Sequence, residues 1–141
     1  MSVVENLSEL SLQYFALVRQ LSSKFELTLS QTLVLLSIPF DGITLSELSE
    51  KLGIDISTMT RNIQRIEKKN LIKRLPNPDD KRSIKLFLSQ RGNTLANSIN
   101  LEISVSLEQI IEKYDLKVSN QIKNNLENLS WDIYLYRQSL I

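Results

Sequence analysis

The sequence predicts a single, mainly α-helical domain, residues 1–141, that carries one small β-hairpin. Three observations lead to this fold class. Apolar residues recur at helical spacing over most of the chain. Two short segments, residues 71–75 and 83–88, have the composition of β-strands. No glycine-rich linker or low-complexity run interrupts the 141 residues, of which 42% are hydrophobic, so one ordinary core is expected.

The composition argues against an enzyme. Histidine and cysteine are both absent, which removes the commonest general base and metal ligand and all thiolate chemistry. The glycines Gly42, Gly53 and Gly92 lie too far apart to form a phosphate-binding loop. The adjacent Asp79 and Asp80 lie beside prolines and are typical of a turn. We therefore expect no catalysis, no cofactor and no metal.

The sequence also shows no membrane-spanning segment. Its longest uncharged apolar run, residues 29–40, is too short to cross a bilayer, which takes about 20 residues. Met1 is not followed by a basic and then apolar leader. We expect a cytoplasmic protein.

Basic charge is concentrated in the middle of the chain. The formal net charge is only +1, yet residues 56–91 contain ten Lys and Arg against three Asp and Glu. Residues 1–55 and 92–141 are both net acidic. A contiguous basic block on an otherwise acidic chain indicates a nucleic-acid partner, with a plain solvated face as the alternative.

Two helices are expected before this block. The first, at about residues 5–26, has an apolar seam at alternating spacings of three and four. Its members are Leu7, Leu10, Tyr14, Leu17 and Leu21. For the second helix, Ser30 is the predicted N-cap, Leu29 and Val34 form a hydrophobic staple, and Pro39 marks the end.

The next two helices predict a helix-turn-helix. Thr44 and Glu47 have the spacing of a capping box, which begins a helix that runs to about Leu52. Gly53 provides the positive φ of a tight turn, and Asp55 caps a helix over residues 56–69. The apolar side of this helix consists of Met59, Ile63 and Ile66. A generic pair of packed helices is the alternative.

The opposite side of the second helix favours DNA recognition. Its residues form hydrogen bonds to base edges and phosphates, and no acid lies among them. They are Ser57, Thr58, Thr60, Arg61, Gln64 and Arg65. The first turn of a recognition helix points into the major groove, so Ser57, Thr58 and Arg61 are the main candidates for base readout. Arg65 is expected at a phosphate.

A β-hairpin is expected to follow Asn70, a residue type that tolerates the left-handed conformation. Pro76 and Pro78 stiffen the connection between its strands. Lys81 and Arg82 at the tip would reach the minor groove or phosphates. Asp80 would orient Arg82, or an arginine of the recognition helix. The hairpin is therefore interpreted as the wing of a winged helix-turn-helix whose core spans about residues 30–88.

Two long helices are expected at the C-terminus. Ser89 caps the first, which runs from about Gln90 to Tyr114, and the second follows Asp115. The apolar residues of the second recur at spacings of three and four. They are Ile122, Leu126, Leu129, Ile133, Tyr136 and Leu140. We expect residues 5–26 and 90–140 to form a dimerisation region across a two-fold axis, with packing of the seams within one chain as the alternative.

The order of these elements resembles the MarR family of transcriptional regulators over essentially the whole chain. The resemblance is carried by TLSELSEKLGIDISTMTRNIQRIEKKNLIKRLPNPDDKRSIKLFLSQRG, residues 44–92. Within it lie the helix-turn-helix, the IEKKNL segment, the D-x-R of the wing at Asp80 to Arg82, and the S-x-x-G at Ser89 to Gly92. One departure is Asn70, where the family usually has glycine.

The resemblance implies a homodimer that binds double-stranded DNA at a pseudopalindrome and usually acts as a repressor. It also implies release by a small, often anionic aromatic ligand, held between the DNA-binding lobe and the dimerisation helices. Near that junction this chain offers Tyr14, Leu17, Phe40 and Ile43 as candidate pocket residues, with plain core packing as the alternative. Cysteine-based sensing is excluded because there is no thiol. A second hypothesis is a winged-helix module that binds an acidic protein partner and has no specific DNA site.

Overall fold

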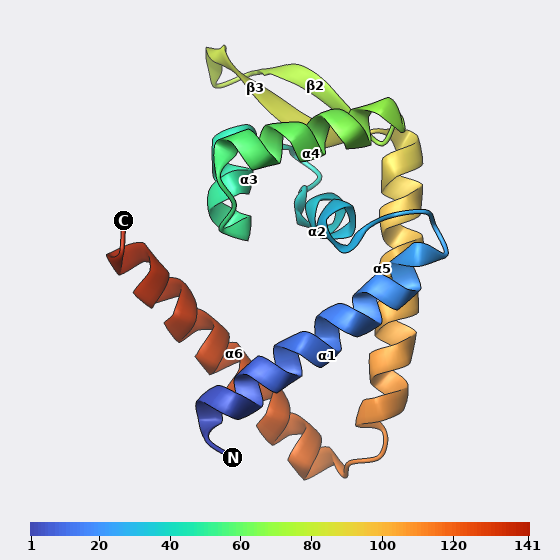
Figure 1. Cartoon of the computed structure of the whole chain (residues 1–141), viewed down its shortest axis with the longest axis vertical. Coiled ribbons are helices and arrows are strands. Elements are labelled where there is room, and N and C mark those ends of the chain that lie inside the picture. The colour runs from blue at the N-terminus through green and yellow to red at the C-terminus, as the bar shows by residue number, and fades with distance from the viewer. The chain divides into compact units, whose positions relative to one another are not determined.

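The computed structural model describes all 141 residues and divides into two compact units, residues 1–103 and 104–141 (Figure 1). The first unit contains α1 (Val3–Ser23), α2 (Leu29–Ser37), β1 (Ile43–Thr44), α3 (Leu45–Leu52), α4 (Ile56–Lys68), β2 (Ile72–Asn77), β3 (Asp80–Leu88) and most of α5 (Gln90–Ile111). The second contains the end of α5 and α6 (Leu116–Ser139). The predicted mainly α fold with a small β-hairpin is confirmed. No helix has the length and apolar character needed to cross a membrane.

The core of the first unit is formed by side chains from α2, α3, α4, the sheet and α5. Met59, Ile63 and Ile66, the predicted apolar side of α4, are all completely buried. They pack in a core that also contains fully or almost fully buried side chains from the neighbouring elements. These are Val34, Leu35, Leu48, Leu71, Leu86 and Ile99. Burying a side chain of this size stabilises the fold by about 1.5–3 kcal/mol, so this packing fixes which face of α4 remains free.

Helix α2 begins earlier than predicted. The N-cap is Thr28, whose hydroxyl accepts the N–H of Gln31 at 3.1 Å, and the Gln31 side chain accepts the N–H of Thr28 at 3.1 Å. The predicted cap at Ser30 is therefore wrong by two residues. Three positions after Ser30 lies Leu33, which cannot return a hydrogen bond, whereas Gln31 can complete the capping box with Thr28. Ser30 lies inside the helix with its hydroxyl available to another element.

The small sheet has the order β1-β3-β2, and all its pairs are antiparallel. Its hairpin strands are longer than predicted, because β2 continues to Asn77 and β3 already begins at Asp80. The turn is therefore Pro78–Asp79, and Lys81 and Arg82 lie in β3 and not at the tip as predicted. Figure 1 shows this hairpin projecting from the same edge of the first unit as α4.

Helix α5 starts at the predicted N-cap. The Ser89 hydroxyl accepts the N–H of Gly92 at 2.9 Å and donates to the carbonyl oxygen of Asn70 at 2.7 Å. Asn70 has φ +60°, the left-handed conformation expected of it. The helix ends at Ile111, three residues before the predicted end at Tyr114, and the Tyr114 side chain is exposed.

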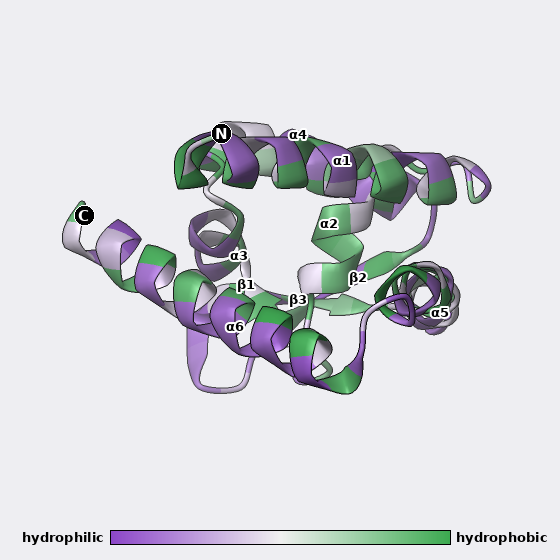
Figure 2. Ribbon diagram, turned by 90° about the horizontal axis from the view of Figure 1, so that it is seen from below, coloured by the Kyte–Doolittle hydropathy of each residue, from purple (hydrophilic) through white to green (hydrophobic).

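In the second unit, α6 begins at the predicted cap, where the Asp115 carboxylate accepts the N–H of Val118 at 2.8 Å. No residue of α6 is buried. Figure 2 shows hydrophobic and hydrophilic residues mixed along α6, as they also are along α1. The large side chains of Trp131 and Tyr134 stack at 5.2 Å on the surface of this helix. An α-helix of this kind retains apolar surface for a partner.

Candidate nucleic-acid interface

The helix-turn-helix is formed by α3 and α4. Thr44 caps α3 by accepting the N–H of Glu47 at 3.1 Å, but the reciprocal bond of the predicted capping box is not formed. Gly53 ends α3 with φ +66°, as the tight turn requires. The turn is closed by the N–H of Ile54, which donates to the carbonyl oxygen of Ser49 at 3.0 Å. Ser49, whose carbonyl oxygen closes the turn, is itself buried.

The first turn of α4 is held by its N-cap. One Asp55 carboxylate oxygen accepts the N–H of Thr58 at 2.9 Å, and the other accepts the Thr58 hydroxyl at 2.9 Å. These two hydrogen bonds hold the pKa of Asp55 below its ordinary value, and the nearby charge of Arg61 adds to the effect. Arg61 in turn donates to the Thr58 hydroxyl at 3.3 Å. Of the three predicted readout residues, Thr58 is therefore engaged in the cap, while Ser57 and the guanidinium of Arg61 are exposed.

Polar contacts hold α4 on both flanks of its buried side. On one flank, Nδ2 of Asn62 donates to the Ser30 hydroxyl of α2 at 2.8 Å. On the other flank, Nη2 and Nε of Arg74 in β2 donate to one carboxylate oxygen of Glu67 at 2.7 and 3.0 Å. This hydrogen bonding and the Glu67 charge raise the pKa of Arg74. Thr60 is half-buried and donates to the carbonyl oxygen of Ile56 at 2.8 Å.

The face of α4 opposite the core is left free. Exposed side chains recur on it at positions that are neighbours on a helix surface. They are Ser57, Arg61, Gln64, Arg65 and Lys68. Lys68 was not among the predicted site residues. Its position four residues after Gln64 and seven after Arg61 is the sequence signal that would have placed it on this face.

The wing contains a bulge built around Asn77. Pro76 pairs with Ile84 and Asn77 pairs with Asp80, so Lys81, Arg82 and Ser83 are extra residues on β3 without partners in the ladder. Nδ2 of Asn77 donates to the Ser83 hydroxyl at 2.9 Å, and Oδ1 of Asn77 accepts the N–H of Asp79 at 3.0 Å. Asn77 is only 8% exposed. This bulge presents Lys81 and Arg82 to solvent.

Asp80 lies beside Arg82, the first-named of its two predicted partners, and its orienting role stays a prediction. Its Oδ1 accepts the N–H of Arg82 at 3.0 Å and lies 3.6 Å from Nε of the same residue. The Arg82 side chain is nevertheless 95% exposed, so the guanidinium can contact a ligand. An exposed pair of this kind adds little to stability.

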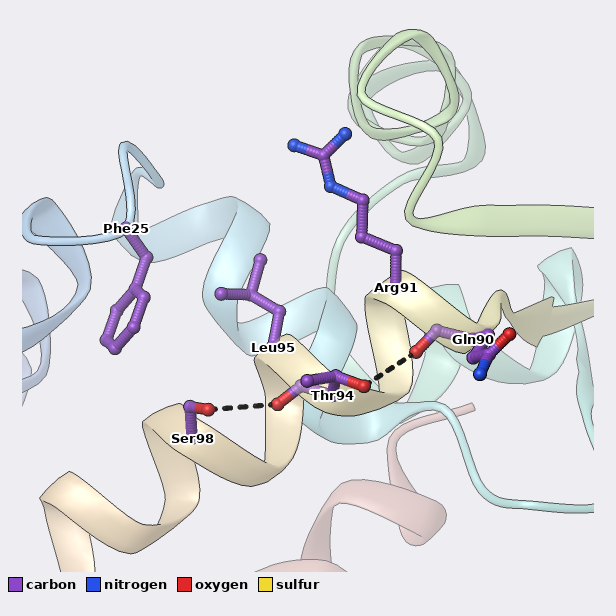
Figure 3. A pocket seen from close by; sticks show the side chains of 6 residues that line it. All are labelled: Phe25, Gln90, Arg91, Thr94, Leu95 and Ser98. Carbon is purple, nitrogen blue, oxygen red and sulfur yellow. Dashed lines mark hydrogen bonds between the residues drawn. The ribbon is translucent and has the colours of Figure 1, made fainter.

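The four candidate ligand-pocket residues differ widely in exposure. Ile43 is buried in β1, Leu17 is half-buried in α1, Tyr14 is 38% exposed and Phe40 is fully exposed. A shallow hollow of about 530 Å³ lies elsewhere, between Phe25 and the first turns of α5 (Figure 3). It is lined by Phe25, Gln90, Arg91, Thr94, Leu95 and Ser98. The predicted effector pocket stays a prediction. No three carboxylates come together as ligands for a metal ion.

This arrangement of two helices, a tight turn, a three-stranded sheet and a projecting hairpin defines a winged helix-turn-helix protein. The sequence model of the MarR family matches residues 27–84. The multiple antibiotic resistance protein MarR of Escherichia coli is 32% identical over 98 residues, which cover 69% of this chain and 68% of that protein. The chain belongs to the MarR family.

Two further comparisons agree with this assignment. The MarR protein of Salmonella typhimurium is 35% identical over 92 residues, and the match spans 64% of each chain. The crystal structure of a mutant of E. coli MarR complexed with operator DNA superposes with a TM-score of 0.74 and 24% identity, covering 90% of this chain and 92% of that one. This similarity confirms the fold.

Proposed function

We propose that this chain is a sequence-specific transcriptional regulator that binds double-stranded DNA. The observation that carries the proposal is the coincidence of the basic block, residues 56–91, with the free face of α4 and with the wing. On that face, Ser57, Arg61 and Gln64 would contact base edges in the major groove, because these residue types supply the donors and acceptors that distinguish base pairs. Arg65 and Lys68 would contact phosphates.

The wing would add contacts beside the major groove. Lys81 and Arg82 leave the β ladder at the bulge, where both side chains are exposed and Nε of Arg82 lies 3.6 Å from the Asp80 carboxylate. A cationic side chain on a projecting hairpin is suited to the adjacent minor groove or its phosphates. Such contacts add affinity for any sequence and make binding depend on salt.

Homodimerisation is part of the proposal. Apolar side chains in α1 and α6 are exposed in the single chain, among them Leu10, Tyr14, Leu126, Ile133 and Tyr136. A second copy that covers both helices would remove this surface from water. Two recognition helices related by a two-fold axis would then bind a pseudopalindrome with half-sites about 34 Å apart.

Repression is the proposed mode of regulation, because the resemblance to the MarR family implies a regulator that usually acts as a repressor. The multiple antibiotic resistance repressor MarR is among the proteins whose structures are similar to this chain. Bound to an operator, the dimer would exclude other proteins from the promoter. A small-molecule effector would then release the dimer from the operator.

The test is a fluorescence anisotropy titration of the purified protein against the DNA upstream of its own gene. A scrambled duplex serves as the control, and both are measured at two salt concentrations. Tight, salt-sensitive and sequence-selective binding supports the proposal. Weak and equal binding to both duplexes by an intact dimer favours the alternative, a module that docks an acidic protein surface. Light scattering checks the dimer, for which a mass of twice 16.2 kDa is expected.

A further inference from the structure

Helix α4 is attached to the start of α2 at two points. Asn62 donates to the Ser30 hydroxyl at 2.8 Å. Lys69, the C-cap residue that directly follows α4, donates through Nζ to the carbonyl oxygen of Glu26 at 2.7 Å and to Oε1 of Gln31 at 3.3 Å. With a rise of about 1.5 Å per residue, the two points lie roughly 10 Å apart along the helix axis. Two separated attachments restrict both the rotation and the tilt of a helix, which a single one does not.

The acceptors are themselves held in place. Gln31 Oε1 also accepts the N–H of Thr28 in the capping box of α2, so the Lys69 contact adds to an existing hydrogen-bonded turn. Glu26 has φ +59°, a left-handed conformation that is strained for a non-glycine residue. The carbonyl group of this strained residue is the one that Lys69 binds. Such strain persists where the surrounding structure requires it.

Neither Asn62 nor Lys69 belongs to the free face of α4. Both are half-buried, and both lie on the flank that meets α2. A side chain on this flank does not touch the ligand. It affects binding indirectly, because it holds in place the residues that contact the ligand. Recognition sites depend on placing their side chains within about 0.5 Å and 10–20° of the required geometry.

We infer that Asn62 and Lys69 are positioning residues that set the rotation and tilt of α4 on α2, and so determine which base edges Ser57, Arg61 and Gln64 meet. The inference rests on the proposed function, since it assigns a role in DNA sequence discrimination. The inference gives Lys69 a different role from its neighbour Lys68, whose side chain lies on the free face of α4.

A different role for Lys69 would be direct phosphate contact, as its place in the basic block suggests. The two roles predict different behaviour. Loss of a phosphate contact weakens binding to every sequence by a similar factor and lowers the slope of log affinity against log salt by about 0.9. Loss of positioning lowers the ratio of specific to nonspecific affinity and leaves the salt slope unchanged.

The experiment uses a duplex selected from a random pool by the parent protein, and a scrambled duplex of the same length and composition. Dissociation constants are measured for both duplexes over a salt series. The variants are Asn62→Leu, which keeps the size but removes the amide, Ser30→Ala, their double variant, and Lys69→Met. Each single variant is expected to lower the specificity ratio about tenfold with an unchanged salt slope. The double variant is expected to match Asn62→Leu, because both changes remove the same hydrogen bond.

Two controls separate positioning from other effects. Asn77→Leu removes a hydrogen bond of the same chemistry, Asn77 to Ser83 at 2.9 Å, together with the bond that Asn77 Oδ1 accepts from the N–H of Asp79. Both lie in the wing, so this variant should weaken binding to both duplexes equally. Ile99→Val shortens a fully buried side chain of α5 and lowers stability without changing either attachment of α4, so it should leave the specificity ratio intact. If Asn62→Leu does not fold, Ser30→Ala removes only the acceptor and carries the same test.

An unchanged specificity ratio in Asn62→Leu, Ser30→Ala and Lys69→Met, with selective binding by the parent, would overturn the inference while leaving the proposed function intact. A lower salt slope in Lys69→Met with an unchanged ratio would assign that residue to phosphate. If the parent protein selects no sequence from the pool, the proposed function fails, and the positioning role fails with it.

Discussion

The carbonyl oxygen of Leu71 occupies the space that a Cβ on Gly92 would need, only 1.9 Å from its ideal position. The same carbonyl oxygen accepts the N–H of Ser89 at 3.0 Å, and the Ser89 hydroxyl caps α5 through the N–H of Gly92. The start of α5 therefore packs directly on the chain segment that links α4 to β2. This contact explains the S-x-x-G spacing, since serine forms the cap and only glycine allows the close approach.

Gly92→Ala should destabilise the protein. The clash is with backbone, which no change of rotamer can relieve, so we expect a loss of roughly 1–3 kcal/mol in the free energy of unfolding. Urea denaturation followed by circular dichroism measures it. Asn93→Ala, at the exposed neighbouring position, is the matched control and should stay within about 0.5 kcal/mol of the parent. Equal midpoints for Gly92→Ala and the parent would contradict the assigned contact.

The N-cap of α4 should weaken in acid. The hydrogen bonds from Thr58 lower the pKa of Asp55 in the folded state below its ordinary value of 3.8. The folded protein therefore binds this proton more weakly than the unfolded chain does. The resulting stabilisation is complete well above pH 3.8 and is lost as the pH falls through the lower folded-state pKa.

Asp55→Asn isolates this contribution, because asparagine also caps helices but does not titrate in this range. Denaturation midpoints measured between about pH 6 and pH 2 should fall less steeply for Asp55→Asn than for the parent. Asp115→Asn makes the same change at the N-cap of α6. Comparing the two variants shows whether a weaker pH dependence of the denaturation midpoint is specific to the cap of α4. Identical pH profiles for Asp55→Asn and the parent would mean that the Asp55 cap makes no difference to stability.

The sequence predicted best where local chemistry decides the structure. Asp55, Ser89 and Asp115 cap the helices as expected, and Met59, Ile63 and Ile66 are buried on one side of α4. In each case the signal lies within a few residues. The start of α2 was misplaced because Thr28 and Ser30 are both capping residues, and only the partner three positions later distinguishes them.

Contacts between distant segments were not predictable in the same way. The attachment of Asn62 to Ser30 joins residues 32 positions apart, and the Glu67 to Arg74 pair depends on how β2 lies against α4. The bulge that displaces Lys81 and Arg82 from the tip depends on the register between Pro76 and Ile84. Periodicity shows which side of a helix or strand is apolar. The residue with which a polar side chain beside that apolar side forms a hydrogen bond is determined by tertiary packing.

Arg82→Ala should weaken binding to most DNA sequences. The side chain is 95% exposed and its charge is not buried in an ion pair, so its removal should cost little stability. If it contacts a phosphate, the salt slope should fall by about 0.9 and the specificity ratio should be unchanged. Anisotropy titrations with specific and scrambled duplexes over a salt series measure both quantities. Parent-like affinity and salt slope in Arg82→Ala would remove this residue from the interface.

Arg61→Ala should change base preference as well as affinity. The guanidinium is anchored by the Thr58 hydroxyl at 3.3 Å and lies on the free face of α4, where arginine can bridge O6 and N7 of guanine. We expect a loss of about 1–3 kcal/mol that is confined to duplexes with the preferred base pair at one position. Arg61→Lys keeps the charge but cannot form the bidentate contact, so it should lose selectivity at the same position while the salt slope is kept. Competition with duplexes changed at single base pairs locates that position. A loss spread evenly over all duplexes would show that Arg61 contacts the backbone and reads no base.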